Sequence, residues 1–145
     1  MTNTKNVLII DDDADFVRAI SGLLASAGYA VGSASNGRDG LDLAKKLLPD
    51  LILLDVMMTE RTEGFFTLQQ IRSVPALQRT PVIVASSIYA DQPLFKVNPE
   101  AGWLPANLFL PKPVDPARLI QESARLIAAS AEAGSEASHV GSDSR

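Results

Sequence analysis

The stretch Leu51-Ile52-Leu53-Leu54-Asp55 decides how this chain folds. Four consecutive large aliphatic residues followed by a polar turn are typical of a strand that is buried on both faces of a parallel sheet. Ligands of open parallel sheets bind just beyond the carboxyl ends of the strands. Asp55 ends its strand at that edge, so it is the first candidate for a functional residue.

A second aliphatic run, residues 7–10, ends in the same way, in Asp11-Asp12-Asp13. If the two strands are neighbours, at least three carboxylates meet at one edge of the sheet. Like charges at such short range repel strongly unless a cation lies between them. A hard divalent cation such as Mg²⁺, which prefers oxygen ligands, is the expected partner.

The rest of the chain alternates between strand and helix patterns. Alternation of this kind predicts crossover connections and a parallel sheet with helices on both faces. We therefore expect an α/β fold with a doubly wound, five-stranded parallel sheet. Proline beside the last strand favours an edge position for it, because an edge strand tolerates a missing donor. The expected strands cover residues 7–10, 29–34, 51–54, 82–85 and 108–110.

Helix signals lie between these strands. Asp13 or a neighbour can cap a helix whose apolar face includes Phe16, and Gly28 ends that helix. Further helices precede Pro49, follow Gly64 and begin at Asp115-Pro116, where a capping residue stands before a proline.

Length and composition limit the function classes. The 145 residues suffice for one domain with a core and are too few for two. The net charge of −4 argues against binding to nucleic acid or to an anionic membrane surface. Without cysteine, disulfides and thiolate sites are excluded, and no apolar run reaches transmembrane length. We expect a soluble cytoplasmic protein with a folded domain over residues 1–130. The Ala-, Glu-, Gly- and Ser-rich residues 131–145 are predicted to form a disordered tail.

The polar residues at the strand ends resemble the receiver domain of two-component response regulators. The resemblance rests on Asp11-Asp12, Asp55, Ser86 and Lys112-Pro113, which follow the first, third, fourth and fifth strands. The resemblance spans residues 5–130, and within the family the chain is similar to receivers of the chemotaxis-regulator type. It implies a flavodoxin-like sheet with the strand order 2-1-3-4-5.

The resemblance also implies a phosphoacceptor and a metal site. Asp55 would be the phosphoacceptor, a carboxylate nucleophile that attacks a phosphoryl group. Asp12 would bind Mg²⁺ directly, with Asp11 in support and Asp55 as a further ligand. Met57 would contribute its backbone carbonyl, so its side chain need not be polar. Mg²⁺ favours one or two carboxylates together with waters and a substrate phosphate.

Three other residues have roles that the resemblance implies. Lys112 would place a point charge on the phosphoryl oxygens. Ser86 would donate its hydroxyl to the aspartyl phosphate, and Phe109 occupies the position of the switch aromatic. The Lys112–Pro113 bond is expected to be a cis peptide, as proline permits.

The implied function is a stand-alone signalling switch rather than an enzyme, with only self-phosphorylation and self-dephosphorylation as its chemistry. A sensor histidine kinase or a histidine phosphotransfer protein would supply the phosphoryl group. The product would then bias a surface that binds a downstream protein, whose identity the sequence does not give. A homodimer formed on phosphorylation is left open.

The chain departs from the family in two connections. The loop between Asp55 and Gly64 is one residue longer than usual, and Thr59 replaces the customary proline. Three prolines interrupt residues 89–107, where the fourth helix of the family is expected. We predict that this helix is short, displaced or absent.

Three other functions compete with the switch. A magnesium phosphatase of the haloacid dehalogenase kind also forms an aspartyl phosphate, and Asp11 and Asp13 have its spacing, but Ala14 and Asp15 follow them. A receiver-like binding module that is never phosphorylated is disfavoured by the complete set of polar residues. A flavodoxin-like nucleotide binder would need a glycine-rich phosphate loop, which we do not find.

Overall fold

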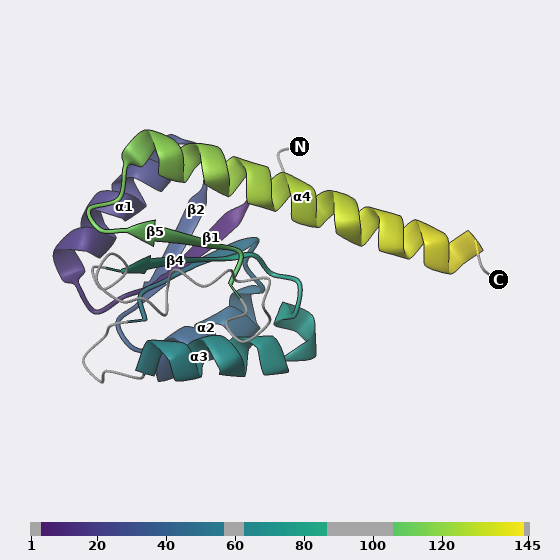
Figure 1. The fold of residues 1–145 in the computed structure, drawn as a ribbon, viewed down its shortest axis with the longest axis horizontal. Coiled ribbons are helices and arrows are strands. Elements are labelled where there is room, and N and C mark those ends of the chain that lie inside the picture. The colour runs from purple at the N-terminus through teal and green to yellow at the C-terminus, as the bar shows by residue number, and fades with distance from the viewer. Residues whose placement is uncertain (1–3, 57–62, 87–105, 144–145) are drawn as a thin grey trace.

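A computed structural model describes residues 4–56, 63–86 and 106–143 of the chain. The described residues form a five-stranded parallel sheet with the strand order β2-β1-β3-β4-β5 (Figure 1). The α/β class, the parallel sheet and the strand order are therefore confirmed. The strands are β1 (Asn6–Ile10), β2 (Ala30–Ala34), β3 (Leu51–Leu54), β4 (Val82–Ser86) and β5 (Leu108–Pro111). The helices are α1 (Ala14–Ser26), α2 (Gly37–Leu47), α3 (Glu63–Ser73), the short 3₁₀ helix η1 (Pro75–Leu77) and α4 (Pro116–Asp143).

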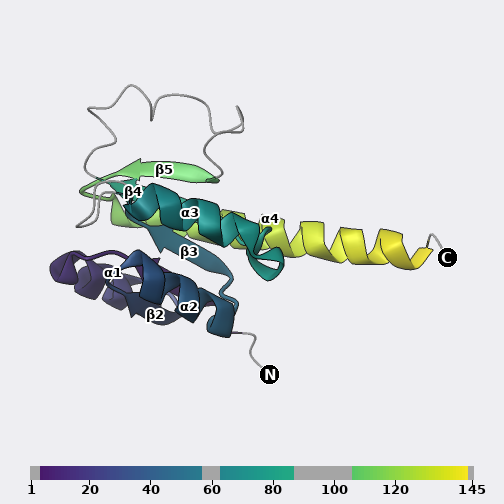
Figure 2. The same cartoon turned by 90° about the horizontal axis from the view of Figure 1, so that it is seen from below.

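The helices cover both faces of the sheet, as the alternating pattern predicts. Helices α1 and α4 lie on one face, and α2 and α3 lie on the other (Figures 1 and 2). Alternate residues of each strand point to opposite faces, so the core falls into two clusters. Ile10, Leu54 and Leu68 belong to the cluster on the α2 and α3 side. Ile9 and Leu119 belong to the cluster on the α1 and α4 side.

Burial along the strands follows their place in the sheet. All four residues of β3 are buried, whereas the edge strand β2 has no buried residue. Strand β5 forms the other edge and ends in Pro111. Its edge position confirms the prediction made from the proline at its end.

The ends of the helices match the signals in the sequence. The Asp13 side chain caps α1 by accepting from the backbone N–H groups of Asp15 and Phe16. Gly28, two residues beyond the end of α1, has φ +100°, a left-handed conformation that side chains other than glycine rarely adopt. At the start of α4, the Arg118 N–H donates to Asp115 Oδ2 over 3.2 Å.

The structure differs from the sequence prediction at residues 131–143. The sequence predicts a disordered tail from Ala131, whereas α4 continues as a helix to Asp143. The last part of α4 extends beyond the sheet (Figure 1). The physical reason is local, because this segment contains no proline and directly follows a formed helix, so that extending it requires no new helix nucleus.

Both predicted departures from the family lie largely outside the described residues. The first is the lengthened loop after Asp55, which contains Met57 and Thr59. The second is the proline-interrupted segment 89–107, for which we predict a degenerate or displaced helix; only its last two residues are described. Among the helices of the described residues, none is long and apolar enough to span a membrane.

Candidate functional site

The register of the sheet brings the polar ends of three strands together. Ile10 pairs with Leu54 in neighbouring β1 and β3, and Ser86 pairs with Pro111 in neighbouring β4 and β5. The residues that follow Ile10, Leu54 and Pro111 are Asp11, Asp55 and Lys112, so they leave the sheet at the same edge. The Asp55 N–H donates to the Ile10 carbonyl over 3.0 Å, and this hydrogen bond fixes Asp55 beside the end of β1, where Asp11 follows.

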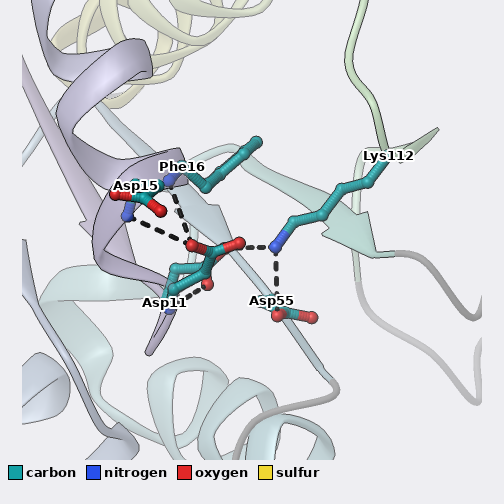
Figure 3. A network of polar contacts seen from close by, with 6 residues as sticks. Asp11, Asp15, Phe16, Asp55 and Lys112 are labelled. Atoms are coloured by element: carbon teal, nitrogen blue, oxygen red, sulfur yellow. Dashed lines mark hydrogen bonds and ion pairs between the residues drawn. The ribbon is translucent and has the colours of Figure 1, made fainter.

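Lys112 lies between the two buried carboxylates (Figure 3). Its Nζ is 2.9 Å from Asp11 Oδ2 and 3.3 Å from Asp55 Oδ2. Lys112 donates a hydrogen bond to Asp55 and forms an ion pair with Asp11. The side chains of Asp11, Asp55 and Lys112 are 1%, 6% and 15% exposed. A cationic side chain is therefore shared by two carboxylates at a nearly closed site.

Burial and the neighbouring charges shift the pKa values of Asp11 and Lys112 in opposing ways. Burial raises the pKa of the Asp11 carboxyl and the Asp55 carboxylate adds to it, although Lys112 and the Asp13 N–H act in the opposite direction. For Lys112, burial alone would lower the pKa, but Asp11 and Asp55 more than offset it, so the pKa lies above its usual value. Lys112 is therefore held as an ammonium at neutral pH.

Asp11, Asp12 and Asp55 form a group that fits a magnesium ion. Each offers one carboxylate oxygen, and these oxygens lie within 4.8 Å of one another. Asp12 is exposed, so the group opens to solvent, as suits an ion that keeps several of its waters. Asp11 Oδ2 is buried and has no hydrogen-bond partner among the described residues. Its one close contact there is the ion pair with Lys112, and a carboxylate oxygen that pairs with a cation in this way also suits a hard metal ion.

Among the other predicted site residues, the structure gives the position of Ser86 and Phe109 in the fold. Ser86 ends β4 at the same edge of the sheet, beside Pro111. Phe109 is buried in the cluster on the α2 and α3 side. The Lys112–Pro113 peptide is cis, which confirms that prediction. Met57 lies outside the described residues.

The sequence did not predict two features of the site. The Asp13 N–H donates to Asp11 Oδ1 over 2.9 Å, so the residue that caps α1 also orients the buried carboxylate. The Phe16 ring lies beneath Lys112, with Nζ 4.1 Å from its centroid. The helical pattern of the sequence predicts Phe16 on the apolar face of the first helix. No local signal shows that this face reaches a lysine nearly a hundred residues away.

A family model described as the response regulator receiver domain matches residues 7–124. The chain is 30% identical over 118 residues to the chemotaxis protein CheY of Thermotoga maritima, which covers 81% of this chain and 92% of that protein.

Two solved structures show the same similarity. The chemotaxis protein CheY4 of Vibrio cholerae superimposes with a TM-score of 0.75 at 30% identity, over 85% of this chain and 98% of that one. The receiver domain of the sensor histidine kinase PA1611 from Pseudomonas aeruginosa PAO1 gives a TM-score of 0.75 at 25% identity, over 86% and 98% of the two chains. That structure has a magnesium ion coordinated in its active site cleft.

Proposed function

The chain belongs to the response regulator receiver domain family, and on that premise we propose that Asp55 accepts a phosphoryl group in a Mg²⁺-dependent reaction. Receiver domains of two-component systems act mainly as signalling switches and take their phosphoryl groups from histidine kinases. The observation that carries the proposal is the position of Asp55, which is nearly buried at the strand ends, beside Lys112 and within reach of two further carboxylates.

Asp11, Asp12 and Asp55 are the residues that would hold Mg²⁺, together with the Met57 carbonyl that the family pattern adds. The ion would neutralise negative charge on the carboxylates and on the transferring oxygens. The magnesium ion in the related PA1611 receiver supports this assignment.

The residues of the chain have separate tasks in the transfer. An oxygen of Asp55 attacks phosphorus, the bond from phosphorus to the donor nitrogen of phosphohistidine breaks, and the released imidazole takes up a proton. The Lys112 ammonium, whose charge is maintained by the neighbouring carboxylates, binds an oxygen of the transferred group. Ser86 then donates its hydroxyl to the aspartyl phosphate.

The phosphorylated protein would act through a change of surface. We assign the donor as a sensor histidine kinase or a histidine phosphotransfer protein and the receiver of the signal as a downstream protein. Ser86 and Phe109 would couple the phosphate to that surface, since they lie on the adjacent strands β4 and β5. Homodimerisation on phosphorylation is one form that this change of surface could take.

The competing phosphatase reaction is disfavoured by the first strand. That class would need Asp11 as nucleophile and Asp13 as its acid–base partner. Here the Asp13 carboxylate caps α1, accepting from the backbone N–H groups of Asp15 and Phe16 over 3.1 and 3.2 Å. The Asp13 carboxylate is therefore engaged with the backbone of α1, while Asp11 forms an ion pair with Lys112.

The test is phosphorylation by a small donor. Wild-type protein, Asp55→Asn and the control Asp42→Asn, an exposed carboxylate on α2, are incubated with acetyl phosphate with and without Mg²⁺. Phosphoprotein is then resolved on a phosphate-affinity gel. A shifted band that needs Mg²⁺, persists in Asp42→Asn and is lost in Asp55→Asn supports the proposal. An unshifted wild-type protein with Mg²⁺ bound would favour a binding module, and steady release of phosphate from a phosphomonoester would favour the phosphatase.

A further inference from the structure

The ammonium group of Lys112 has a third contact besides its two carboxylates. Its Nζ lies 4.1 Å from the centroid of the Phe16 ring, well inside the roughly 6 Å limit for a cation–π interaction. Figure 3 shows Phe16 approaching from α1 while Asp55 approaches from the sheet. The ammonium is therefore in contact with a neutral aromatic face as well as with two anions.

The Phe16 ring is held in place from two directions. It packs against the core cluster on the α1 and α4 side, where it is partly buried. Its backbone N–H donates to Asp13 Oδ1 over 3.2 Å, and the Asp13 N–H in turn donates to Asp11 Oδ1. One short segment thus fixes both the carboxylate and the ring that lie against the same ammonium.

The contacts of Lys112 with the carboxylates and with the Phe16 ring respond differently when Mg²⁺ or a phosphoryl group binds. Asp11 and Asp55 are also the residues assigned to Mg²⁺, so a bound cation competes with Lys112 for their oxygens. The ring carries no net charge, so it neither binds Mg²⁺ as a carboxylate does nor repels an incoming phosphoryl group. A leucine at position 16 would fill the space but would lack the negative face that attracts a cation.

We infer that Phe16 is a positioning residue that holds the Lys112 ammonium over the strand ends, an inference that rests on the phosphoryl transfer proposed above. When Mg²⁺ binds the carboxylates, the ring still holds the Lys112 ammonium at the position where it contacts the oxygens of the transferred phosphoryl group. Phe16 takes no part in the bonds that form or break.

The first part of the test needs no phosphorylation. Three variants are compared: Phe16→Leu, which removes the aromatic face; Phe16→Tyr, which keeps it; and Tyr29→Leu, which removes an aromatic ring that packs on the same core cluster. Nuclear magnetic resonance follows the methylene protons next to Lys112 Nζ, assigned by comparison with Lys112→Arg. We expect these protons to be shifted upfield by the ring in wild type, Phe16→Tyr and Tyr29→Leu, and to lose that shift in Phe16→Leu. An unchanged shift in Phe16→Leu would overturn the inference.

The second part measures the consequence for transfer. With saturating Mg²⁺ and acetyl phosphate, we expect phosphorylation to slow by about fivefold to tenfold in Phe16→Leu, as loss of a desolvated cation–π contact implies. Phe16→Tyr and Tyr29→Leu should react at the wild-type rate, and the affinity of all four proteins for Mg²⁺ should be equal. A Phe16→Leu variant that loses the upfield shift but reacts at the wild-type rate would overturn the positioning role. A wild-type protein that accepts no phosphoryl group would overturn the proposed function and the role in transfer, while the Lys112 signals would still show whether the ring holds the ammonium.

Discussion

Lys112 Nζ lies 2.9 Å from Asp11 Oδ2, in a pair whose acidic side chain is 1% exposed. Burial raises the pKa of this carboxyl, and the Asp55 carboxylate raises it further. One ammonium cannot neutralise the three carboxylates that meet at this edge, so the free protein keeps an excess of negative charge there. The site is therefore built at a cost in stability that a bound cation would relieve.

Replacing Asp11 by asparagine removes one of these charges and keeps the shape of the side chain. In the presence of a chelator, we expect Asp11→Asn to be more stable than wild type by about 1 kcal/mol, because a like-charge contact and a buried charge are lost. Lys112 keeps its hydrogen bond to Asp55. On addition of Mg²⁺, the wild type should gain stability and the variant should gain much less. Urea unfolding with and without Mg²⁺ measures both quantities.

The control for this prediction is Asp42→Asn, which removes an exposed carboxylate from α2. It should leave both the basal stability and the gain from Mg²⁺ unchanged. If Asp11→Asn gained as much stability from Mg²⁺ as the wild type does, Asp11 would not be part of the magnesium site.

Gly40 lies at a close approach of α2 to β1. A Cβ atom at this position would lie 2.6 Å from Ile10 Cδ1 and within 2.9 Å of two other atoms of that side chain. Ile10 is fully buried, so it has little room to move. We expect Gly40→Ala to cost roughly 1–3 kcal/mol through overpacking, less the small gain in helix propensity. Chemical denaturation gives the difference.

The matched control is Gly22→Ala, in the middle of α1, where an added Cβ meets no atom within 4 Å. That change should stabilise by roughly 0.5–1 kcal/mol, the usual advantage of alanine over glycine in a helix. Ile10→Val should also cost less in the Gly40→Ala background than in the wild type, because it removes the atom nearest to the new methyl group. Equal effects of alanine at both glycines would contradict the close packing of α2 on β1.

Ser123 places a hydroxyl group in the interface between α4 and the sheet. The residue is fully buried, and its Oγ has no hydrogen-bond partner within the part of the chain that the structure describes. Ser123→Ala is expected to stabilise the protein by about 1 kcal/mol, since an unsatisfied buried group is removed. Ser26→Ala serves as the comparison because that exposed hydroxyl donates to the carbonyls of Gly22 and Leu23 over 3.0 Å. Thermal unfolding that showed Ser123→Ala to be the less stable of the two variants would reveal a partner for the Ser123 hydroxyl.

Much of the fold follows from local patterns in the sequence. Aliphatic runs that end in Asp11 and Asp55 predict two buried strands and the edge at which their carboxylates meet, and the register bears this out. The helix starts are equally local, because Asp13 and Asp115 each accept from a backbone N–H group of the first turn. The burial of a strand on both faces and the capping of a helix are encoded by residues that are neighbours in the sequence. Both features can therefore be predicted from it.

The features that the sequence does not predict depend on contacts between distant segments. The approach of Phe16 to Lys112 requires the position of α1 relative to β5, and no periodicity encodes it. The close packing of Gly40 on Ile10 likewise exists only once α2 lies on β1. At the other end of the chain, composition predicted disorder from Ala131, since nothing there can be buried. The helix that precedes the segment favours the continuation of α4 instead, since no new helix nucleus is needed.

Arg72 joins three parts of the chain at the sheet edge opposite the candidate site. Its Nη1 donates to the carbonyls of Leu77 and Thr80 over 3.0 and 2.6 Å, and its Nη2 donates to Asn107 Oδ1 over 3.1 Å. That Asn107 oxygen also accepts from the Val82 N–H, so the guanidinium ties the turn after α3 to the start of β4 and β5. Burial lowers the pKa of Arg72, which indicates that the group is poorly hydrated.

We expect Arg72→Lys to lower the free energy of unfolding by roughly 1.5–3 kcal/mol, because an ammonium cannot span these acceptors with the fixed fork of a guanidinium. The exposed Arg79→Lys should change the free energy of unfolding by less than about 0.5 kcal/mol. Equal stability of the two variants in urea unfolding would mean that the Arg72 contacts contribute nothing to holding the edge strand in place.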